Sequence, residues 1–135
     1  MIMEYDFKDG NGSVPASRHK NGGGWVANSA TVDATCYIGY DAKVYGNAWV
    51  FGNAGVYGNA EVSDYAKVFG NAEVFGNAWV SDYALVFDDA RVFGDAEVSD
   101  YALVFGNAKV YGNAWVYSDI GGGFKCGNKN EDQSI

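Results

Sequence analysis

The stretch that decides the fold is residues 44–116, which read V-YGNAWV-FGNAGV-YGNAEV-SDYAKV-FGNAEV-FGNAWV-SDYALV-FDDARV-FGDAEV-SDYALV-FGNAKV-YGNAWV. One six-residue unit recurs here without a slip. It reads alanine, a variable residue, valine, an aromatic residue or serine, glycine or aspartate, and then asparagine, aspartate or tyrosine. The aliphatic position repeats every six residues from Val26 to Val116, and a small residue follows each of them by four positions, up to Ala114. A fixed period of this kind is typical of solenoids, which stack small repeated units.

Each unit predicts a short β-strand followed by a corner. In Ala48-Trp49-Val50-Phe51, two-residue alternation places the first and third side chains on one face and the second and fourth on the other. The pair Gly52-Asn53 follows, and these residue types tolerate the positive φ angles of tight corners. Because only small or β-branched side chains point inward, we expect a narrow, dry interior. Successive coils should then pair through parallel ladders.

A second period predicts how many sides each coil has. Ser-Asp-Tyr replaces the usual corner at three places that lie eighteen residues apart, namely 63–65, 81–83 and 99–101. Eighteen residues are three units, so a three-sided coil stacks these corners along one edge, whereas a two-sided coil would scatter them. The sequence therefore predicts a triangular prism. Its sixteen aliphatic positions, three to a coil, give about five coils.

The chain resembles the hexapeptide-repeat superfamily of left-handed parallel β-helices, whose units carry an aliphatic residue and a small residue four positions later. The resemblance covers residues 26–116 and implies an all-β fold, a single-stranded left-handed parallel β-helix. The chain departs from the commonest family pattern, which places glycine directly after the aliphatic residue, because here glycine comes one position later. It is more similar to bacterial and phage repeat proteins than to the catalytic acyltransferases of the superfamily.

Composition sets the domain organisation and limits the partners. The 135 residues predict one domain, with an N-terminal cap at 1–25, a solenoid at 26–117, and a C-terminal cap and polar tail at 118–135. A net charge of −8 disfavours binding to nucleic acid phosphates. The sequence offers neither an apolar run of membrane-spanning length nor the pattern of a secretory signal. We therefore expect cytoplasmic synthesis and no membrane partner, with a virion as the other location that the resemblance suggests.

The residues that could carry chemistry are few. Acyltransferases of the superfamily generally use a histidine base at the solenoid, but the one histidine here, His19, lies before the first coil. Cys36 occupies an inward small position and Cys126 lies in the polar tail, so neither completes a zinc site with His19. We expect no catalytic residue and no cofactor. The stacked corners carry an aspartate ladder that could hold a hard cation or could bond to corner amides, namely Asp64, Asp82 and Asp100.

One outer side of the predicted prism is the main candidate interface. Residues just before and after each valine point outward, and on this side they are mostly apolar, so they should form a continuous strip. Three interpretations are open: aromatic ladders that shield the corners, an interface with a second copy, or aromatic stacking on sugar rings. The predicted interface residues are Trp49, Phe51, Phe69, Leu85, Phe87, Leu103 and Phe105.

From these features we expect a non-enzymatic structural or interaction protein, a rigid acidic prism that presents a repetitive surface. The resemblance implies a homotrimer of parallel prisms and suggests a role in phage or virion assembly. An acyltransferase-like enzyme is the second hypothesis, and it rests on the fold alone. A carbohydrate- or surface-binding module that uses the aromatic residues is the third.

Overall fold

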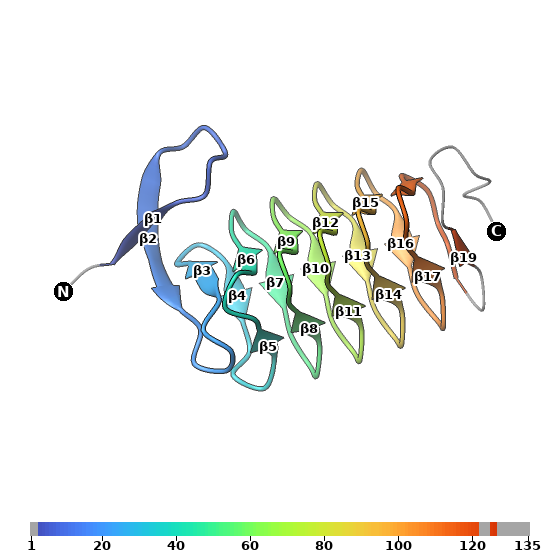
Figure 1. Ribbon diagram of the computed structural model, residues 1–135, viewed down its shortest axis with the longest axis horizontal. Coiled ribbons are helices and arrows are strands. Elements are labelled where there is room, and N and C mark those ends of the chain that lie inside the picture. Colours follow the sequence, from blue (N-terminus) through green and yellow to red (C-terminus); the bar gives the residue numbers. More distant parts are fainter. Residues whose placement is uncertain (1–2, 122–124, 127–135) are drawn as a thin grey trace.

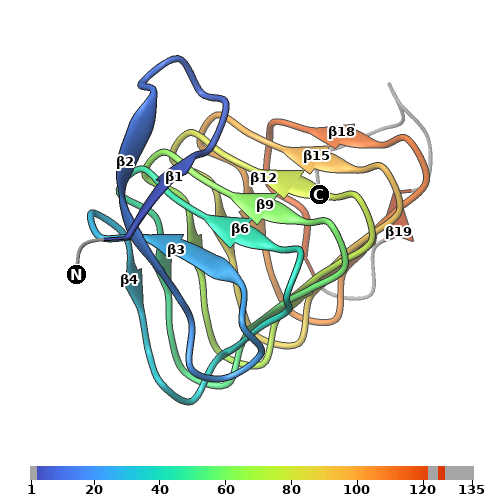
Figure 2. The same ribbon diagram turned by 60° about the vertical axis from the view of Figure 1, so that its left-hand side comes forward.

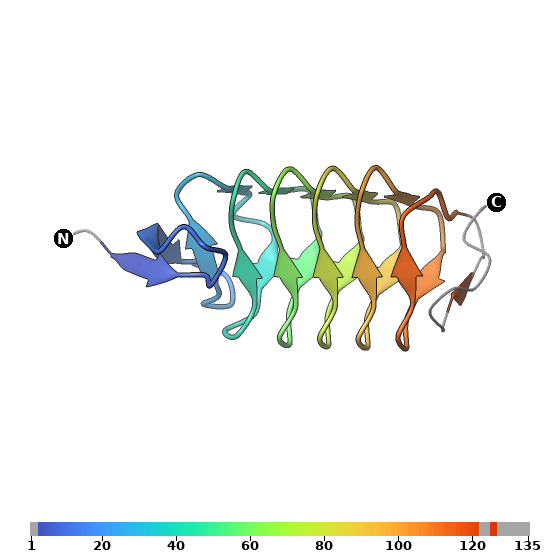
Figure 3. The same ribbon diagram turned by 90° about the horizontal axis from the view of Figure 1, so that it is seen from above.

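The computed structural model describes residues 3–121 and 125–126, and it is a β-solenoid of about five turns (Figure 1). The described residues contain no helix, and therefore none that could span a membrane. Seen from above, the coils follow one another at even spacing along the long axis of the molecule (Figure 3). The all-β solenoid predicted from the repeat is confirmed.

Three sheets form the three sides, and each takes every third strand of the solenoid. The five-stranded sheet contains β4 (Thr31–Val32), β7 (Trp49–Val50), β10 (Lys67–Val68), β13 (Leu85–Val86) and β16 (Leu103–Val104). The six-stranded sheet contains β5 (Tyr37–Ile38), β8 (Gly55–Val56), β11 (Glu73–Val74), β14 (Arg91–Val92), β17 (Lys109–Val110) and β19 (Lys125–Cys126). The eight-stranded sheet (Figure 2) contains β1 (Glu4–Asp6), β2 (Ser13–Arg18), β3 (Trp25–Ala27), β6 (Lys43–Val44), β9 (Glu61–Val62), β12 (Trp79–Val80), β15 (Glu97–Val98) and β18 (Trp115–Val116).

The register between coils is one residue to one residue, eighteen positions apart. Val68 pairs with Val50 on one side and with Val86 on the other, both in parallel ladders. The same spacing relates every parallel pair of strands from β3 to β18, whereas β17 and β19 pair at a spacing of sixteen. The three-sided coil of eighteen residues predicted from the Ser-Asp-Tyr corners is therefore confirmed.

The core consists almost entirely of stacked valines and alanines. From Cys36 to Ile120, every inward position is buried, with 0 or 1% of its surface exposed. Each buried valine contributes about 1.5–3 kcal/mol relative to an exposed one. Because each side chain contacts its equivalents one coil above and below, the stability of a solenoid is shared among neighbouring coils.

The corners continue the hydrogen-bond ladders from coil to coil. At the corner of Gly58, the N–H of Asn59 donates to the carbonyl of Gly76 one coil further on, at 2.7 Å. Gly58 has a φ of 67°, in the region where an L-residue with a side chain is strained. Aspartates take the same conformation at four equivalent corners, at φ values of 57–60°: Asp64, Asp82, Asp88 and Asp100.

The N-terminal segment extends the eight-stranded sheet instead of adding a coil. Strand β1 pairs antiparallel with β2, and β2 pairs antiparallel with β3. The hairpin stands at one end of the row of coils in Figure 1. Phe7 from its loop is buried and stacks on Tyr45, with ring centroids 4.7 Å apart. Val26, Ala30 and Val32 in the first coil remain partly exposed beside residues 17–20.

At the other end, the repeat stops after Trp115–Val116. Ile120 is buried and forms an isolated parallel bridge with Val104. The predicted C-terminal cap and tail at 118–135 otherwise lies largely outside the described residues.

Candidate functional site

The seven predicted interface residues lie together on the outer face of the five-stranded sheet, here called the five-stranded face. Four phenylalanines form a ladder along it, with successive ring centroids 4.7, 5.0 and 5.5 Å apart and nearly parallel planes. Each such pair contributes about 0.5–1.5 kcal/mol beyond its area of burial. The ladder consists of Phe51, Phe69, Phe87 and Phe105.

A second row on this face lies beside the ladder and is mostly apolar. Trp49 is 42% exposed, and the Lys67 ammonium lies over its ring at 5.2 Å. Leu85 and Leu103 follow in register on the next two coils, and both are half-buried. Among the outward residues of the strands β7, β10, β13 and β16, Lys67 is therefore the only charged one.

A tyrosine ladder borders the same face, at the corners that precede β10, β13 and β16. Tyr65, Tyr83 and Tyr101 stack with centroids 5.0 and 4.9 Å apart, and all three are exposed. The five-stranded face thus carries two aromatic ladders. Along the sequence, Leu85 and Leu103 each lie between a tyrosine of one ladder and a phenylalanine of the other. Self-stacking of the rings and an interface between copies are compatible, because stacked rings still present their edges to solvent.

The aspartates of the Ser-Asp-Tyr corners bond to the backbone of the next coil. The Asp64 carboxylate accepts a hydrogen bond from the N–H of Asp82 at 3.1 Å, and the Asp82 carboxylate accepts one from the N–H of Asp100 at 2.9 Å. Among the residues that the structure describes, no group of three His, Cys, Asp or Glu side chains is placed to hold a metal ion. The geometry therefore assigns Asp64 and Asp82 a backbone-bonding role.

The six-stranded sheet carries a mixed ladder. Tyr57, Phe75, Phe93 and Tyr111 stack at 4.9, 4.9 and 5.5 Å. Glu73 pairs with Arg91 one coil away, at 3.8 Å between Oε1 and Nε. The Tyr57 hydroxyl also donates to Glu73 at 3.0 Å.

His19 and Cys36 are close in space, but through the backbone of the cysteine. His19 Nε2 lies 2.9 Å from the Cys36 carbonyl oxygen. The Cys36 side chain is buried among the inward residues, and this burial raises the pKa of its thiol. The pair therefore joins the N-terminal segment to the first coil. The side chain of Cys126 lies outside the described part of the structure.

The outer face of the eight-stranded sheet, here called the eight-stranded face, holds a site that the sequence pattern did not reveal. A hollow of about 300 Å³ is lined by Asp9 from the hairpin loop and by residues from four coils: Tyr45, Ser63, Asp64, Trp79, Ser81 and Glu97. The hairpin supplies Asp9 to the hollow, and the sequence of the hairpin has no periodic signal. One feature of the repeat could have indicated it, since tryptophan and glutamate alternate at eighteen-residue intervals from Glu61 to Trp115.

Tyr45 anchors one end of this hollow. It is buried under Phe7, and its hydroxyl donates to Glu61 at 2.7 Å. Burial is the main cause that raises the pKa of Tyr45 well above its ordinary value of 10.0, and the bond to Glu61 adds to it. Contacts with Ser63 and Trp79 act in the opposite direction and are smaller.

This shift predicts loss of stability in alkali. The folded state keeps the Tyr45 proton to a higher pH than the unfolded chain does, so the unfolded chain ionises first as the pH rises above 10.0. Each further pH unit should then lower the free energy of unfolding by up to about 1.4 kcal/mol for this group. Below that pH the contribution of Tyr45 should be constant.

Urea unfolding of the wild type and of the Tyr45→Phe variant between pH 7 and pH 11 checks whether Tyr45 causes the loss of stability in alkali. At pH 7 the variant should be less stable by about 0.5–1.5 kcal/mol, because it lacks the bond to Glu61. Above pH 10 the difference in free energy of unfolding between the wild type and the variant should become smaller. Two curves that stay parallel over the whole range would show that Tyr45 is not the responsible group.

The comparisons with known proteins give no relative. No protein-family model matches the chain, and neither a curated protein nor a solved structure is significantly similar to it.

Proposed function

We propose that the protein is a non-enzymatic structural protein that assembles with further copies of itself through the five-stranded face. The observation that supports this most is the continuity of that face. An exposed tryptophan, two leucines and two stacked aromatic ladders lie over successive coils, and a single lysine supplies the charge of the central row. A contiguous exposed apolar strip is typical of interaction sites in soluble proteins.

Charge favours a second copy as the occupant of this face. The chain has a net charge of −8, so two copies repel each other, and the repulsion is smallest where their contact has no carboxylates. The outward strand residues of the eight-stranded sheet include Glu61 and Glu97, and those of the six-stranded sheet include three charges, Glu73, Arg91 and Lys109. From β7 to β16, the five-stranded sheet has no carboxylate. It is therefore the side on which association costs least.

We propose a closed homotrimer with parallel prisms, in which the same face of each copy turns toward a three-fold axis. Closed symmetry buries the apolar strip of every copy, whereas an open arrangement would leave one strip exposed. We also propose membership of the hexapeptide-repeat superfamily, which the eighteen-residue coil and the small inward residues support. The left-handed coil is what this membership would imply.

Leu103→Asp tests the interface. Leu103 is half-buried on the five-stranded face, and an aspartate there places three carboxylates together in a trimer. Size-exclusion chromatography with light scattering should give a trimer for the wild type and a monomer for the variant. Each introduced charge should weaken assembly by at least about tenfold.

Asn107→Asp is the matched control. It adds the same charge at an exposed corner of the same coil, where the preceding coil already carries Asp89. This variant should remain a trimer. A wild type that is monomeric at all concentrations, or a Leu103→Asp variant that assembles normally, would rule out the five-stranded face as the interface.

A further inference from the structure

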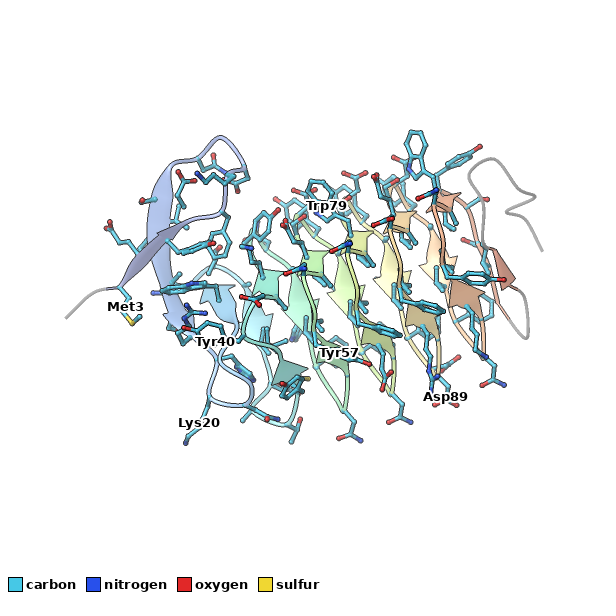
Figure 4. The ribbon with its side chains drawn as sticks, viewed as in Figure 1. Met3, Lys20, Tyr40, Tyr57, Trp79 and Asp89 are labelled. Atoms are coloured by element: carbon cyan, nitrogen blue, oxygen red, sulfur yellow. The ribbon has the colours of Figure 1, made fainter. Side chains whose placement is uncertain are left out.

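The hollow on the eight-stranded face is acidic and contains an exposed aromatic ring. Its lining includes three carboxylates, Asp9, Asp64 and Glu97, and it includes no lysine or arginine. Trp79 forms one wall and is 45% exposed. In Figure 4 its side chain lies on the upper face of the solenoid, above the strands of the eight-stranded sheet. A cationic group can therefore reach both the ring and the carboxylates from solvent.

Trp79 and Glu97 are direct neighbours in this site. They are paired residues of β12 and β15, so their side chains project from the same face one coil apart. Glu61 accepts a hydrogen bond from Tyr45, and Glu73 is bonded to Tyr57 and paired with Arg91. Within the described residues, the Glu97 carboxylate has no such partner.

In the first coil, an arginine of the chain itself lies over a tryptophan of the same sheet. Trp25 occupies the outward position equivalent to Trp79, three coils earlier in the same sheet. The guanidinium of Arg18 lies over the Trp25 ring at 4.5 Å and over Tyr40 at 4.1 Å. It also donates to the carbonyls of Gly23 and Tyr40, at 3.0 Å each. The chain thus already contains one guanidinium that lies over an indole ring and donates its N–H groups to oxygen acceptors.

Trp49 repeats the pattern with Lys67 on the five-stranded face. By contrast, no cation among the described residues lies over Trp79. A guanidinium placed there could stack on the indole ring and present its N–H groups to the Glu97 carboxylate, because its charge is planar and its donors are arranged in a fork.

We propose that this hollow binds an arginine side chain in an exposed segment of a partner protein. The guanidinium stacks on Trp79 and donates to Glu97, while Asp9 and Asp64 add longer-range attraction. The hollow's volume of about 300 Å³ is at the lower end of the range for ligand pockets, which suits one side chain. This site lies on a different face from the proposed self-association, so either proposal can fail without the other.

Other ligand classes fit the site less well. Phosphates and anionic glycans would be repelled by the three carboxylates. A metal ion needs ligands grouped more closely than any His, Cys, Asp or Glu cluster in the described residues. A neutral oligosaccharide could stack on Trp79, but it would not use the charge of the hollow, and the experiment separates the two.

The test is an NMR titration of the full chain that follows the indole Nε1–H signal of Trp79, identified with a Trp79→Phe variant. The probe is the peptide acetyl-Gly-Gly-Arg-Gly-Gly-amide, and the matched ligand control replaces arginine by citrulline, which is similar in shape but uncharged. We expect the arginine peptide to bind with a Kd of about 0.1–1 mM. The citrulline peptide should bind at least about tenfold more weakly.

Two variants test the site and one serves as control. Trp79→Ala and Glu97→Gln should each weaken binding about tenfold, and both residues are exposed, so the fold should be kept. Because Trp79→Ala lacks the indole signal, its titration follows the backbone N–H signal of Glu97, which is calibrated against the indole signal in the wild type. Asp89→Asn removes one exposed charge from a corner far from the eight-stranded face (Figure 4) and should change the Kd by less than about twofold.

Three results would overturn the proposal. Equal binding of the arginine and citrulline peptides would show that charge is not recognised. Equal loss in Glu97→Gln and Asp89→Asn would show general attraction to an acidic protein. Binding of cellohexaose at Trp79, unchanged between 50 mM and 500 mM NaCl, together with no binding of the arginine peptide, would identify a glycan site instead.

Discussion

Replacing Val86 by aspartate should unfold the central coils at neutral pH. Val86 is completely buried between Val68 and Val104, its equivalents in the adjacent coils. A carboxylate there would have no charged or hydrogen-bonding partner in a core of valines and alanines. We expect a loss of more than about 4 kcal/mol, a large part of the stability of a chain of this size. Because the coils support one another, the damage should spread beyond a single turn.

Leu85→Asp is the control for this change. Leu85 is the residue directly before Val86, but alternation along the strand turns it outward, where it is half-buried. The substitution should leave the far-ultraviolet circular dichroism spectrum of the wild type unchanged and cost no more than about 1 kcal/mol within one copy. Thermal unfolding of the two variants makes the comparison. Similar losses at the two positions would contradict the inward and outward assignment.

The solenoid could be predicted from the sequence because its signals are local and repeated. A valine every six residues specifies the inward row, and the Ser-Asp-Tyr corners at eighteen-residue intervals specify three sides. Each coil has the same neighbours as the next, so one correct unit gives the whole stack. The ion pair of Glu73 with Arg91 is a consequence of that register, since the two residues lie eighteen positions apart.

The N-terminal hairpin could not be predicted in the same way. Residues 1–25 have no period, and the packing of Phe7 on Tyr45 joins positions 38 residues apart in the sequence. The same holds for the guanidinium of Arg18 between Trp25 and Tyr40. Such contacts depend on how the hairpin meets the solenoid, and composition does not indicate that geometry.

The two candidate sites differ in the same way: one could be predicted from the repeat and the other could not. The predicted apolar strip lies on one face, because its residues belong to the repeat. The acidic hollow escaped prediction because Glu61 and Glu97 occupy equivalent positions in the coil, and they differ only in the residue sixteen positions earlier, which is Tyr45 for Glu61 and Ser81 for Glu97. Their difference arises from Tyr45, whose hydroxyl reaches Glu61 and leaves Glu97 without a partner among the described residues.

The second large effect is expected at a corner. Gly94 has a φ of 69°, and a Cβ added there would lie 2.8 Å from the backbone nitrogen of Gly112 in the next coil. Valine is strongly disfavoured in this conformation, since its branched side chain crowds the backbone. Gly94→Val should therefore cost about 3 kcal/mol, from the strained φ and the close contact together. The melting temperature should fall by about 10 °C.

Gly94→Asp separates backbone strain from simple loss of a glycine. Aspartate already occupies the equivalent corner at Asp64, Asp82, Asp88 and Asp100, so the stacked coils can accommodate its Cβ. At Asp88 the carboxylate accepts a hydrogen bond from the N–H of Gly106 in the next coil, at 3.0 Å. An aspartate at 94 could bond to the N–H of Gly112 in the same way and offset much of the strain. Differential scanning calorimetry should show a loss below about 1 kcal/mol for Gly94→Asp. If both variants lost stability equally, the corner would be limited by space and not by the conformation that aspartate and glycine share.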